Sequence, residues 1–168
     1  YRGFDLSMMP RPIKVGERMN TQGSRKTKEL LIARDHDGLI ELGKSQERAG
    51  AAILDVCATL TERQTEKEDL EDLVSSLRES VTVPLMLDST DVSVIEAALK
   101  KYPGTAFINS ANLEDGGEKA KKIFSLAAEH GAYVVCLTID ESGMARTVEK
   151  KLEVAGRLLD IAAEFGIP

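Results

Sequence analysis

The chain has 168 residues, of which 42% are hydrophobic and 30% are charged, and its formal net charge at pH 7 is −6. This composition is that of a globular protein, and it excludes a disordered or collagen-like chain. An acidic balance with only 4% aromatic residues argues against binding to nucleic acid. The apolar runs are far shorter than the roughly 20 residues of a membrane span, so we expect no membrane partner.

Both cysteines, Cys57 and Cys136, lie in apolar runs. We interpret them as reduced thiols in the core, which is typical of a cytoplasmic protein. Cys57 lies near the end of its run and could instead touch a ligand. The sequence does not open with a charged segment followed by an apolar stretch, so no secretory signal is predicted.

Short runs rich in apolar and β-branched residues alternate with helical stretches along the chain. The runs predicted to be strands are 13–19, 52–58, 83–88, 106–110 and 133–140. Several of them are nearly continuous apolar segments that end in a polar residue. That pattern is typical of parallel strands that helices cover on both faces of the sheet.

The segments between the predicted strands carry helix-capping signals. Asp35 precedes one helical pattern, and Thr65 with Glu68 has the spacing of a capping box before another. Glycines or Pro103-Gly104 end four of the patterns. The predicted helices run from Asp35 to Ala49, from Thr65 through Leu77, from Thr90 or Asp91 to Pro103, from Gly117 to His130 and from Arg146 to Phe165.

This order of elements predicts an α/β fold built from five βα units. A (β/α)8 barrel averages roughly 31 residues per unit, so a chain of this length supplies about five of its eight units. The spacing therefore fits either an open doubly wound sheet or the first five units of such a barrel. Periodicity alone does not separate these two architectures.

Polar side chains follow the apolar runs, where ligands bind in both architectures. Asp88 and Asn109 end neighbouring runs, and Asp140 ends the last one. A carboxylate can accept from an amine and a ring N–H together, while an amide both donates and accepts. Asp88 with Asn109 therefore suits the amino-pyrimidinone edge of a pterin. The alternative is that Asp88 and Asp140 only cap the helices that follow.

Other kinds of site have little support in the sequence. The two histidines, His36 and His130, lie in helical stretches without a second ligand at metal-binding spacing, so no metal site is predicted. The sequence contains neither a Gly-x-Ser-x-Gly elbow nor a Walker loop.

Six motifs together resemble one known family. They are VGERMN (15–20), GSRK (23–26), LDST (87–90), VIEAALKKYPG (94–104), INSANLEDG (108–116) and LTIDESGMA (137–145). In this order they resemble the pterin-binding domain of methyltetrahydrofolate methyltransferases, a family that includes cobalamin-dependent methionine synthases and corrinoid protein methyltransferases. More distantly they are similar to dihydropteroate synthases. The resemblance covers residues 13–168, so we expect residues 1–12 to be a linker and the rest to be part of a pterin-binding barrel.

The resemblance implies a dihydropteroate-synthase-like (β/α)8 barrel, represented here by its first five units and truncated before strand six. It implies methyltetrahydrofolate as substrate and transfer of the N5 methyl group to cob(I)alamin on a corrinoid partner domain. Asp88 and Asn109 match the residues that hold the pterin ring. The other positions that it implies for the site are Gly23, Ser24 and Arg25 in the first loop, Asn20, Asp55 and Asn112 lining the mouth, and Asp140 at its floor.

The chain also departs from the family pattern. Many relatives have Asn where this chain has Cys57. The second pterin-holding Asp follows strand six in the family, and an Asn near N5 follows strand seven, so we expect the 168-residue chain on its own to be inactive.

Two alternatives to the methyltransferase remain open. One is a non-catalytic incomplete barrel that acts only after association with another chain, for which a homo-oligomer is one form. The other is a pteroate-condensing enzyme, although GERMN (16–20) stands where that enzyme class has an Asn-x-Thr-x-Asp-Ser motif.

Overall fold

The computed structural model describes residues 11–61 and 63–168. All but the last two residues of the expected linker 1–12 lie outside the described residues. The chain forms two compact units, the first ending at Ala106 and the second running from Phe107 to Pro168. Among the described residues, no helix has the length and apolar character needed to cross a membrane.

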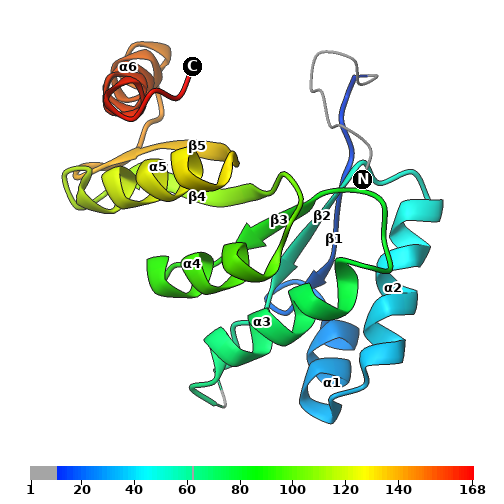
Figure 1. Ribbon diagram of the computed structural model, residues 1–168. Coiled ribbons are helices and arrows are strands. Elements are labelled where there is room, and N and C mark those ends of the chain that lie inside the picture. The colour runs from blue at the N-terminus through cyan, green and yellow to red at the C-terminus, as the bar shows by residue number, and fades with distance from the viewer. Residues whose placement is uncertain (1–10, 62) are drawn as a thin grey trace. The chain divides into compact units, whose positions relative to one another are not determined.

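The first unit contains a parallel sheet of three strands, shown in Figure 1. These strands are β1 (Val15–Asn20), β2 (Ile53–Cys57) and β3 (Leu85–Asp88). β2 pairs with both neighbours in parallel, and the register of β1 against β2 shifts at a bulge between Gly16 and Met19. Three predicted strands are therefore present within two residues of their predicted starts.

Four helices pack around this sheet. They are α1 (Arg25–Ala33), α2 (His36–Arg48), α3 (Glu66–Leu77) and α4 (Val92–Lys101). α2 packs against α3, and α3 packs against α4, which Figure 1 shows as a succession around the strands. This arrangement covers the strands with the apolar faces of amphipathic helices, as the sequence pattern predicts.

The caps of these helices agree with the prediction in two cases out of three. Asp35 accepts the backbone N–H of Gly38 at 2.9 Å, and Asp91 accepts that of Ser93 at 2.8 Å. The predicted capping box at Thr65 is wrong, because the Thr65 hydroxyl donates to the side chain of Asp69, at 2.7 Å from Oδ2, and accepts no backbone N–H of α3. The buried carboxylate of Asp69 needs hydrogen-bond donors, and the Thr65 hydroxyl is one of them, so this hydroxyl does not cap the helix.

The sequence patterns predict no helix over residues 25–33, where α1 lies. Ser24 is its N-cap and accepts the Thr27 backbone N–H at 3.2 Å. Leu30 and Leu31 are buried on its inner face. The helix is missed because nine residues provide only two turns of periodic pattern and because its first turn contains no acidic residue.

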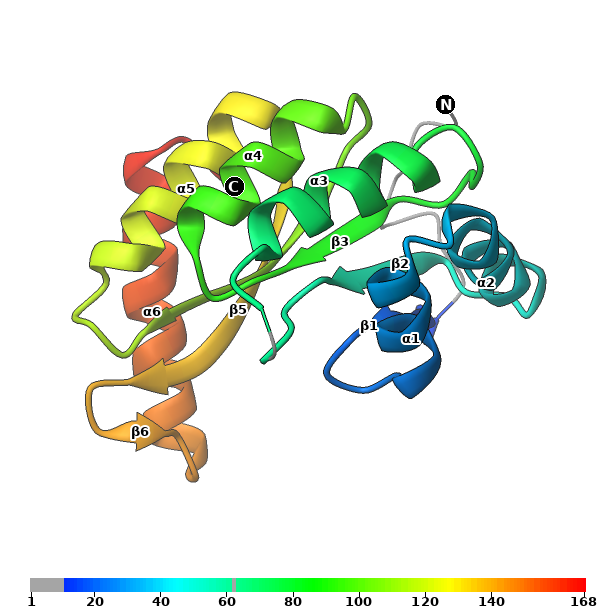
Figure 2. The ribbon, with the colours of Figure 1, turned by 90° about the horizontal axis from the view of Figure 1, so that it is seen from below.

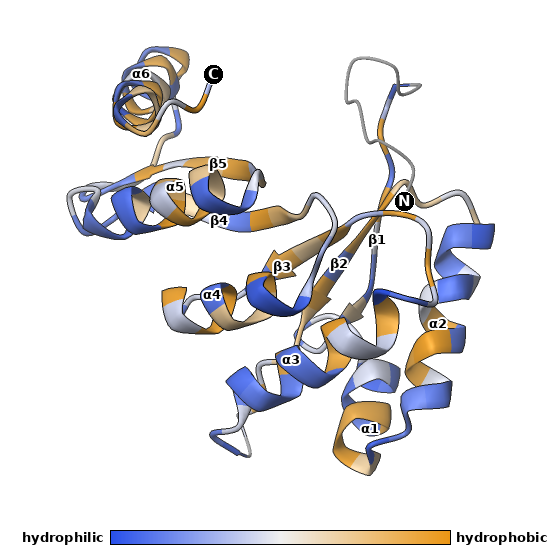
Figure 3. Cartoon of the chain, viewed as in Figure 1, coloured by the Kyte–Doolittle hydropathy of each residue, from blue (hydrophilic) through white to orange (hydrophobic). Residues whose placement is uncertain are grey.

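The core of the first unit lies between β2, β3 and helices α2 to α4. All five residues of β2 are buried, so this strand is covered on both faces as predicted. The hydropathy colouring in Figure 3 shows the apolar strands β2 and β3 against mixed helices, whereas β1 is largely hydrophilic. The fully buried leucines that make up this core are Leu54, Leu70, Leu73, Leu77, Leu85 and Leu87.

The second unit adds two further βα repeats. β4 (Phe107–Leu113) pairs in parallel with β5 (Tyr133–Asp140), and β5 pairs antiparallel with the two-residue strand β6 (Gly143–Met144). Helices α5 (Glu118–His130) and α6 (Val148–Glu164) pack on these strands and on each other, as Figure 2 shows. The short antiparallel strand β6 was not predicted.

The apolar strand β5 is less covered than its sequence predicts. Cys136 and Leu137 are exposed in its middle, so the interpretation of Cys136 as a core thiol is wrong. Among the described residues of this unit, β5 has β4 on one edge and only β6, at its end, on the other. Both cysteines are free thiols, and Cys57 is buried as expected.

Candidate functional site

The ends of β1 and β3 and the middle of β2 bring three predicted site residues into contact. Asn20 Nδ2 donates to Asp55 Oδ2 at 2.7 Å and to Asp88 Oδ2 at 2.8 Å. Asp55 is buried, with 4% of its surface exposed, while Asn20 and Asp88 are half-buried. Because parallel strands end at the same edge of a sheet, residues far apart in sequence meet here. We call Asn20, Asp55 and Asp88 the strand-end cluster.

The loop after β1 is tied to the end of β2 beside this cluster. Asn20 Oδ1 accepts the backbone N–H of Gln22 at 2.8 Å. The Gln22 amide and the Thr21 hydroxyl both donate to the Thr59 carbonyl, at 2.8 and 2.7 Å. These bonds hold Asn20 in place from its own loop and from the neighbouring strand.

The turn after Asp88 is held in a similar way. The buried Ser89 hydroxyl donates to Glu66 Oε1 at 2.5 Å and accepts the Asp91 backbone N–H at 3.1 Å. Glu66 begins α3, so the turn that carries Asp88 into α4 is bonded to the preceding helix. The strand-end cluster therefore stands on loops that neighbouring elements fix on both sides.

The residues of the first loop lead into a helix. Gly23 is exposed, Ser24 caps α1, and Arg25 is the first residue of α1. The Arg25 guanidinium pairs with Glu29 at 2.8 Å on the helix surface, with 92% of the Arg25 side chain exposed. The backbone N–H groups of Gly23 and Ser24 donate to the Asn20 carbonyl at 3.2 and 2.9 Å, which joins this loop to the strand-end cluster. Contact of Gly23, Ser24 and Arg25 with a substrate stays a prediction.

The second unit carries the remaining predicted residues. Asn109 is half-buried in β4, opposite Val135 of β5. The Asn112 side chain donates to Glu114 Oε2 at 3.0 Å and accepts the Glu114 backbone N–H at 3.1 Å, which stabilises the turn after β4. Because Asp88 belongs to the first unit and Asn109 to the second, their sharing of one cavity stays a prediction.

Asp140 ends β5 as a buried carboxylate with several donors. Lys150 Nζ lies 2.8 Å and an Arg157 guanidinium nitrogen 3.2 Å from Asp140 Oδ2, and the Ser142 hydroxyl donates to Oδ1 at 2.6 Å. The hydrogen bonds from Lys150 and then Ser142 hold the pKa of Asp140 well below its ordinary value. Asp140 is thus an ionised group that joins the end of β5 to α6.

Cys57 is a buried free thiol at the end of β2, beside the strand-end cluster. Its Sγ lies 3.4 Å from Thr59 Oγ1 and 3.9 Å from Thr21 Oγ1. Burial is the main cause that raises the pKa of the Cys57 thiol above its ordinary value. The group is therefore a neutral thiol packed beside the cluster and not a thiolate nucleophile.

A hollow of about 410 Å³ adjoins the turn after Asp88. Its lining includes Glu66 and Asp91, which bond to Ser89, together with Arg63, Gln64 and Lys67. Arg63 pairs with Asp69 at 2.9 Å. The lining contains both cationic and anionic side chains, which favours no single sign of ligand charge.

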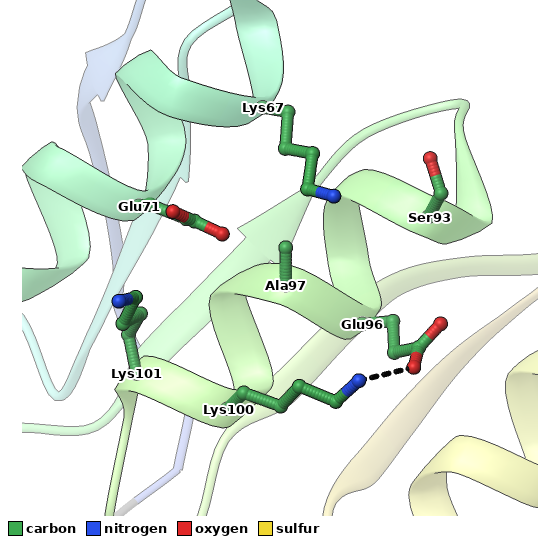
Figure 4. Close-up of a pocket in the computed structure, with 7 residues that line it drawn as sticks. All are labelled: Lys67, Glu71, Ser93, Glu96, Ala97, Lys100 and Lys101. Carbon is green, nitrogen blue, oxygen red and sulfur yellow. Dashed lines mark hydrogen bonds and ion pairs between the residues drawn. The ribbon is translucent and has the colours of Figure 1, made fainter.

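A second hollow lies on the outer helices. It has a volume of about 330 Å³ between α3 and α4 and is shown in Figure 4. Lys67 and Glu71 line it from α3, and Glu96, Lys100 and Lys101 line it from α4, with an ion pair between Lys100 and Glu96. Such an ion-paired helix surface is typical of a solvated face and not of a ligand site.

Sequence patterns do not identify all of the residues that support the strand-end cluster. Thr59, Gln22 and Glu66 act through bonds to neighbouring loops, and no local pattern signals such partners. The described residues hold no group of three or more His, Cys, Asp or Glu side chains placed to bind a metal ion. The half-buried Asp88 offers acceptor oxygens, which suit a ligand rich in N–H donors.

Two known proteins with a similar sequence are methionine synthases. The chain is 43% identical over 171 residues to the methionine synthase of Mycobacterium leprae and 45% identical to that of Mycobacterium tuberculosis. Each match covers 99% of this chain but only 14% of the relative's length. The chain therefore corresponds to one region of much longer proteins.

The fold is similar to that of a solved dihydropteroate synthase. The structure of the enzyme from Clostridium difficile, determined in the presence of pteroic acid, aligns with a TM-score of 0.64 at 18% sequence identity, over 92% of this chain and 59% of that one. This similarity confirms the expected fold class, the first βα units of a dihydropteroate-synthase-like barrel. The model of the family described as "Pterin binding enzyme" matches residues 16–168, and the chain therefore belongs to that family.

Proposed function

We propose that this chain binds the pterin ring of methyltetrahydrofolate at the carboxyl ends of its strands. In the full-length protein the bound folate would donate its N5 methyl group to a cobalamin. The observation that carries this proposal is the strand-end cluster, where Asp55 and Asp88 from separate strands share the amide of Asn20. The family and the methionine synthase relatives support the same ligand.

The chemistry of the pterin matches the groups at these strand ends. Its amino-pyrimidinone edge presents N–H donors together with a carbonyl oxygen. A half-buried carboxylate such as Asp88 accepts two N–H bonds in one plane, and an amide such as Asn109 can accept and donate. We assign Asp88 and Asn109 to the ring, with the loop residues Gly23, Ser24 and Arg25 contacting the rest of the substrate.

The role of this chain in methyl transfer is to bind and orient the substrate. When present on its partner domain, cob(I)alamin supplies the nucleophile, so the pterin domain needs no nucleophilic Ser or Cys of its own. The N5 amine is a poor leaving group and requires a proton or a strong hydrogen bond as its bond to the methyl carbon breaks. Holding the ring with one face open to the corrinoid domain makes an in-line transfer possible.

The test is the affinity of the full-length protein for 5-methyltetrahydrofolate after Asp88→Ala. Loss of a hydrogen-bonded carboxylate should weaken binding by about 1–3 kcal/mol, which isothermal titration calorimetry can resolve. Asp160→Ala is the control, since Asp160 is an exposed carboxylate on α6, and it should bind like wild type. Equal affinities for Asp88→Ala and wild type would remove Asp88 from the site and contradict the proposal.

A further inference from the structure

The bonding pattern of Asn20 fixes the orientation of its amide. Oδ1 accepts the Gln22 backbone N–H at 2.8 Å, which turns Nδ2 toward the two carboxylates. A primary amide has two N–H donors. One of them bonds to Asp55 and the other to Asp88, so this amide has no third N–H to offer to a ligand.

Asp55 lies deeper in the protein than the other two members of the cluster. It occupies the middle of β2, where all five residues are buried, and only 4% of its surface is exposed. A carboxylate at such a position is costly unless donors stabilise it, and Asn20 is one of them. Asp55 is therefore placed to hold Asn20 and not to meet a ligand from solvent.

Asp88 is the outermost carboxylate of the cluster and the one assigned to the pterin. Its Oδ2 atom accepts from Asn20, which restricts rotation of the carboxylate about its last torsion angle. The direction of its acceptor lone pairs is therefore set by Asn20. A bidentate contact with a planar ring depends on that direction.

We propose that Asn20 and Asp55 are positioning residues for pterin recognition. Asp55 orients the Asn20 amide, and Asn20 holds Asp88 in the plane in which it accepts the N–H groups of the ring. The inference rests on the proposed function and adds two residues that affect affinity without touching the ligand.

The experiment replaces the donors of Asn20 without changing its size. Asn20→Asp keeps an acceptor for the Gln22 N–H but puts a third carboxylate beside Asp55 and Asp88. At pH 8 the full-length variant should bind 5-methyltetrahydrofolate at least about tenfold more weakly than wild type, because a charge-assisted bond to Asp88 is lost.

The pH dependence separates positioning from a general structural defect. Neighbouring carboxylates raise the pKa of the introduced carboxyl group, so it takes up a proton as the pH falls and again becomes a donor. The loss of affinity of Asn20→Asp relative to wild type should therefore become smaller as the pH is lowered from 8 to 5. Asn20→Ala provides no donor at any pH, so its loss of affinity relative to wild type should stay the same over this range.

The matched control is Asp69→Asn. Asp69 is as buried as Asp55, at 4% exposed, but it pairs with Arg63 and does not touch the cluster. This variant should unfold at a lower temperature and still bind 5-methyltetrahydrofolate with wild-type affinity. That result would show that loss of stability alone does not reproduce the Asn20 effect.

The inference would be overturned if Asn20→Asp bound 5-methyltetrahydrofolate as tightly as wild type at pH 8, or if its loss of affinity did not change with pH. If circular dichroism shows that Asn20→Asp is unfolded, Asn20→Ala decides: at least about tenfold weaker binding supports positioning, and wild-type binding overturns it. Asp88→Ala, measured in parallel, distinguishes the two proposals. If it weakens binding while the Asn20 variants do not, only the positioning role fails.

Discussion

Asp140 shows what a polar residue at a strand end can do for the fold. Its carboxylate is 3% exposed and accepts from Ser142 while pairing with Lys150 and Arg157 on α6. Donors from α6 and from the turn after β5 converge on one carboxylate, so ionisation of Asp140 is coupled to the packing of α6 against β5. The substrate role that the family resemblance implies for this residue stays a prediction.

We therefore expect Asp140→Asn to lower stability in a pH-dependent way. The folded-state pKa of Asp140 lies below its ordinary value of 3.8. The stability that its ionised form provides is thus complete well above that value and is lost as the pH falls below it. Thermal melts from pH 7 to pH 3 should show a gap between wild type and variant that shrinks below about pH 4.

Asp160→Asn is the control for this measurement, because Asp160 lies exposed on the same helix. Its melting temperature should stay close to that of wild type at every pH. A gap for Asp140→Asn that persists unchanged down to pH 3 would show that the ion pairs do not stabilise the fold.

Sequence patterns located the strand-end carboxylates but not their bonding partners. Asp55 and Asp88 each follow buried residues of a parallel strand. This pattern of apolar residues followed by a carboxylate predicts that both lie toward the same edge of the sheet. The contact with Asn20 depends on the bulge between Gly16 and Met19, which shifts the pairing of β1 by one residue. A shift of one residue changes which side chains face a given side, and nothing in the local sequence reveals it.

At the level of elements, Ser24 has a structural role that the sequence interpretation did not include. It caps α1 by accepting the Thr27 backbone N–H. Substrate contact by the same residue stays a prediction, and the two roles can be separated by variants that keep or remove the cap.

Ser24→Ala should lower the free energy of unfolding by about 0.5–2 kcal/mol, because an N-cap acceptor is lost. Ser24→Asp should restore most of it, since Asp is an equally good cap and suits the positive end of the helix dipole. Denaturant titrations measure both effects. Ser125→Ala, at an exposed position within α5, should be nearly neutral, and an equally small effect of Ser24→Ala would contradict the capping role.

Element prediction succeeded where strand and helix patterns were long and failed where they were short. β5 was placed correctly from Tyr133 to Asp140 because it is a continuous apolar run. The two-residue strand β6 and the nine-residue helix α1 are too short to show a period. The exposure of Cys136 was also missed, because coverage of a strand edge depends on its neighbours and not on its own composition.

On the scale of the whole molecule, the second unit presents an apolar stripe. Val148, Leu152 and Leu159 lie on one side of α6 and are 67%, 69% and 65% exposed. Positions four and seven residues apart share a helix face. Exposed apolar stripes of this kind favour association with another surface.

For the 168-residue chain we expect self-association through this stripe. Replacing Leu152 with Glu and Leu159 with Lys should weaken it at least tenfold, because burying one leucine contributes about 1.5–3 kcal/mol. Sedimentation over a range of concentrations measures the change. A charge swap that leaves the stripe intact, Lys151→Glu with Glu164→Lys, is the control, and unchanged association of the Leu152 and Leu159 variant would exclude the stripe as the contact.

The hydroxyl of Ser89 links the turn beyond β3 to the first residue of α3 and to the start of α4. Backbone torsion angles next to Asp88 are therefore restricted before any small molecule arrives. Complex formation at Asp88 would cost little conformational entropy, so its affinity would reflect mainly the contacts that are made.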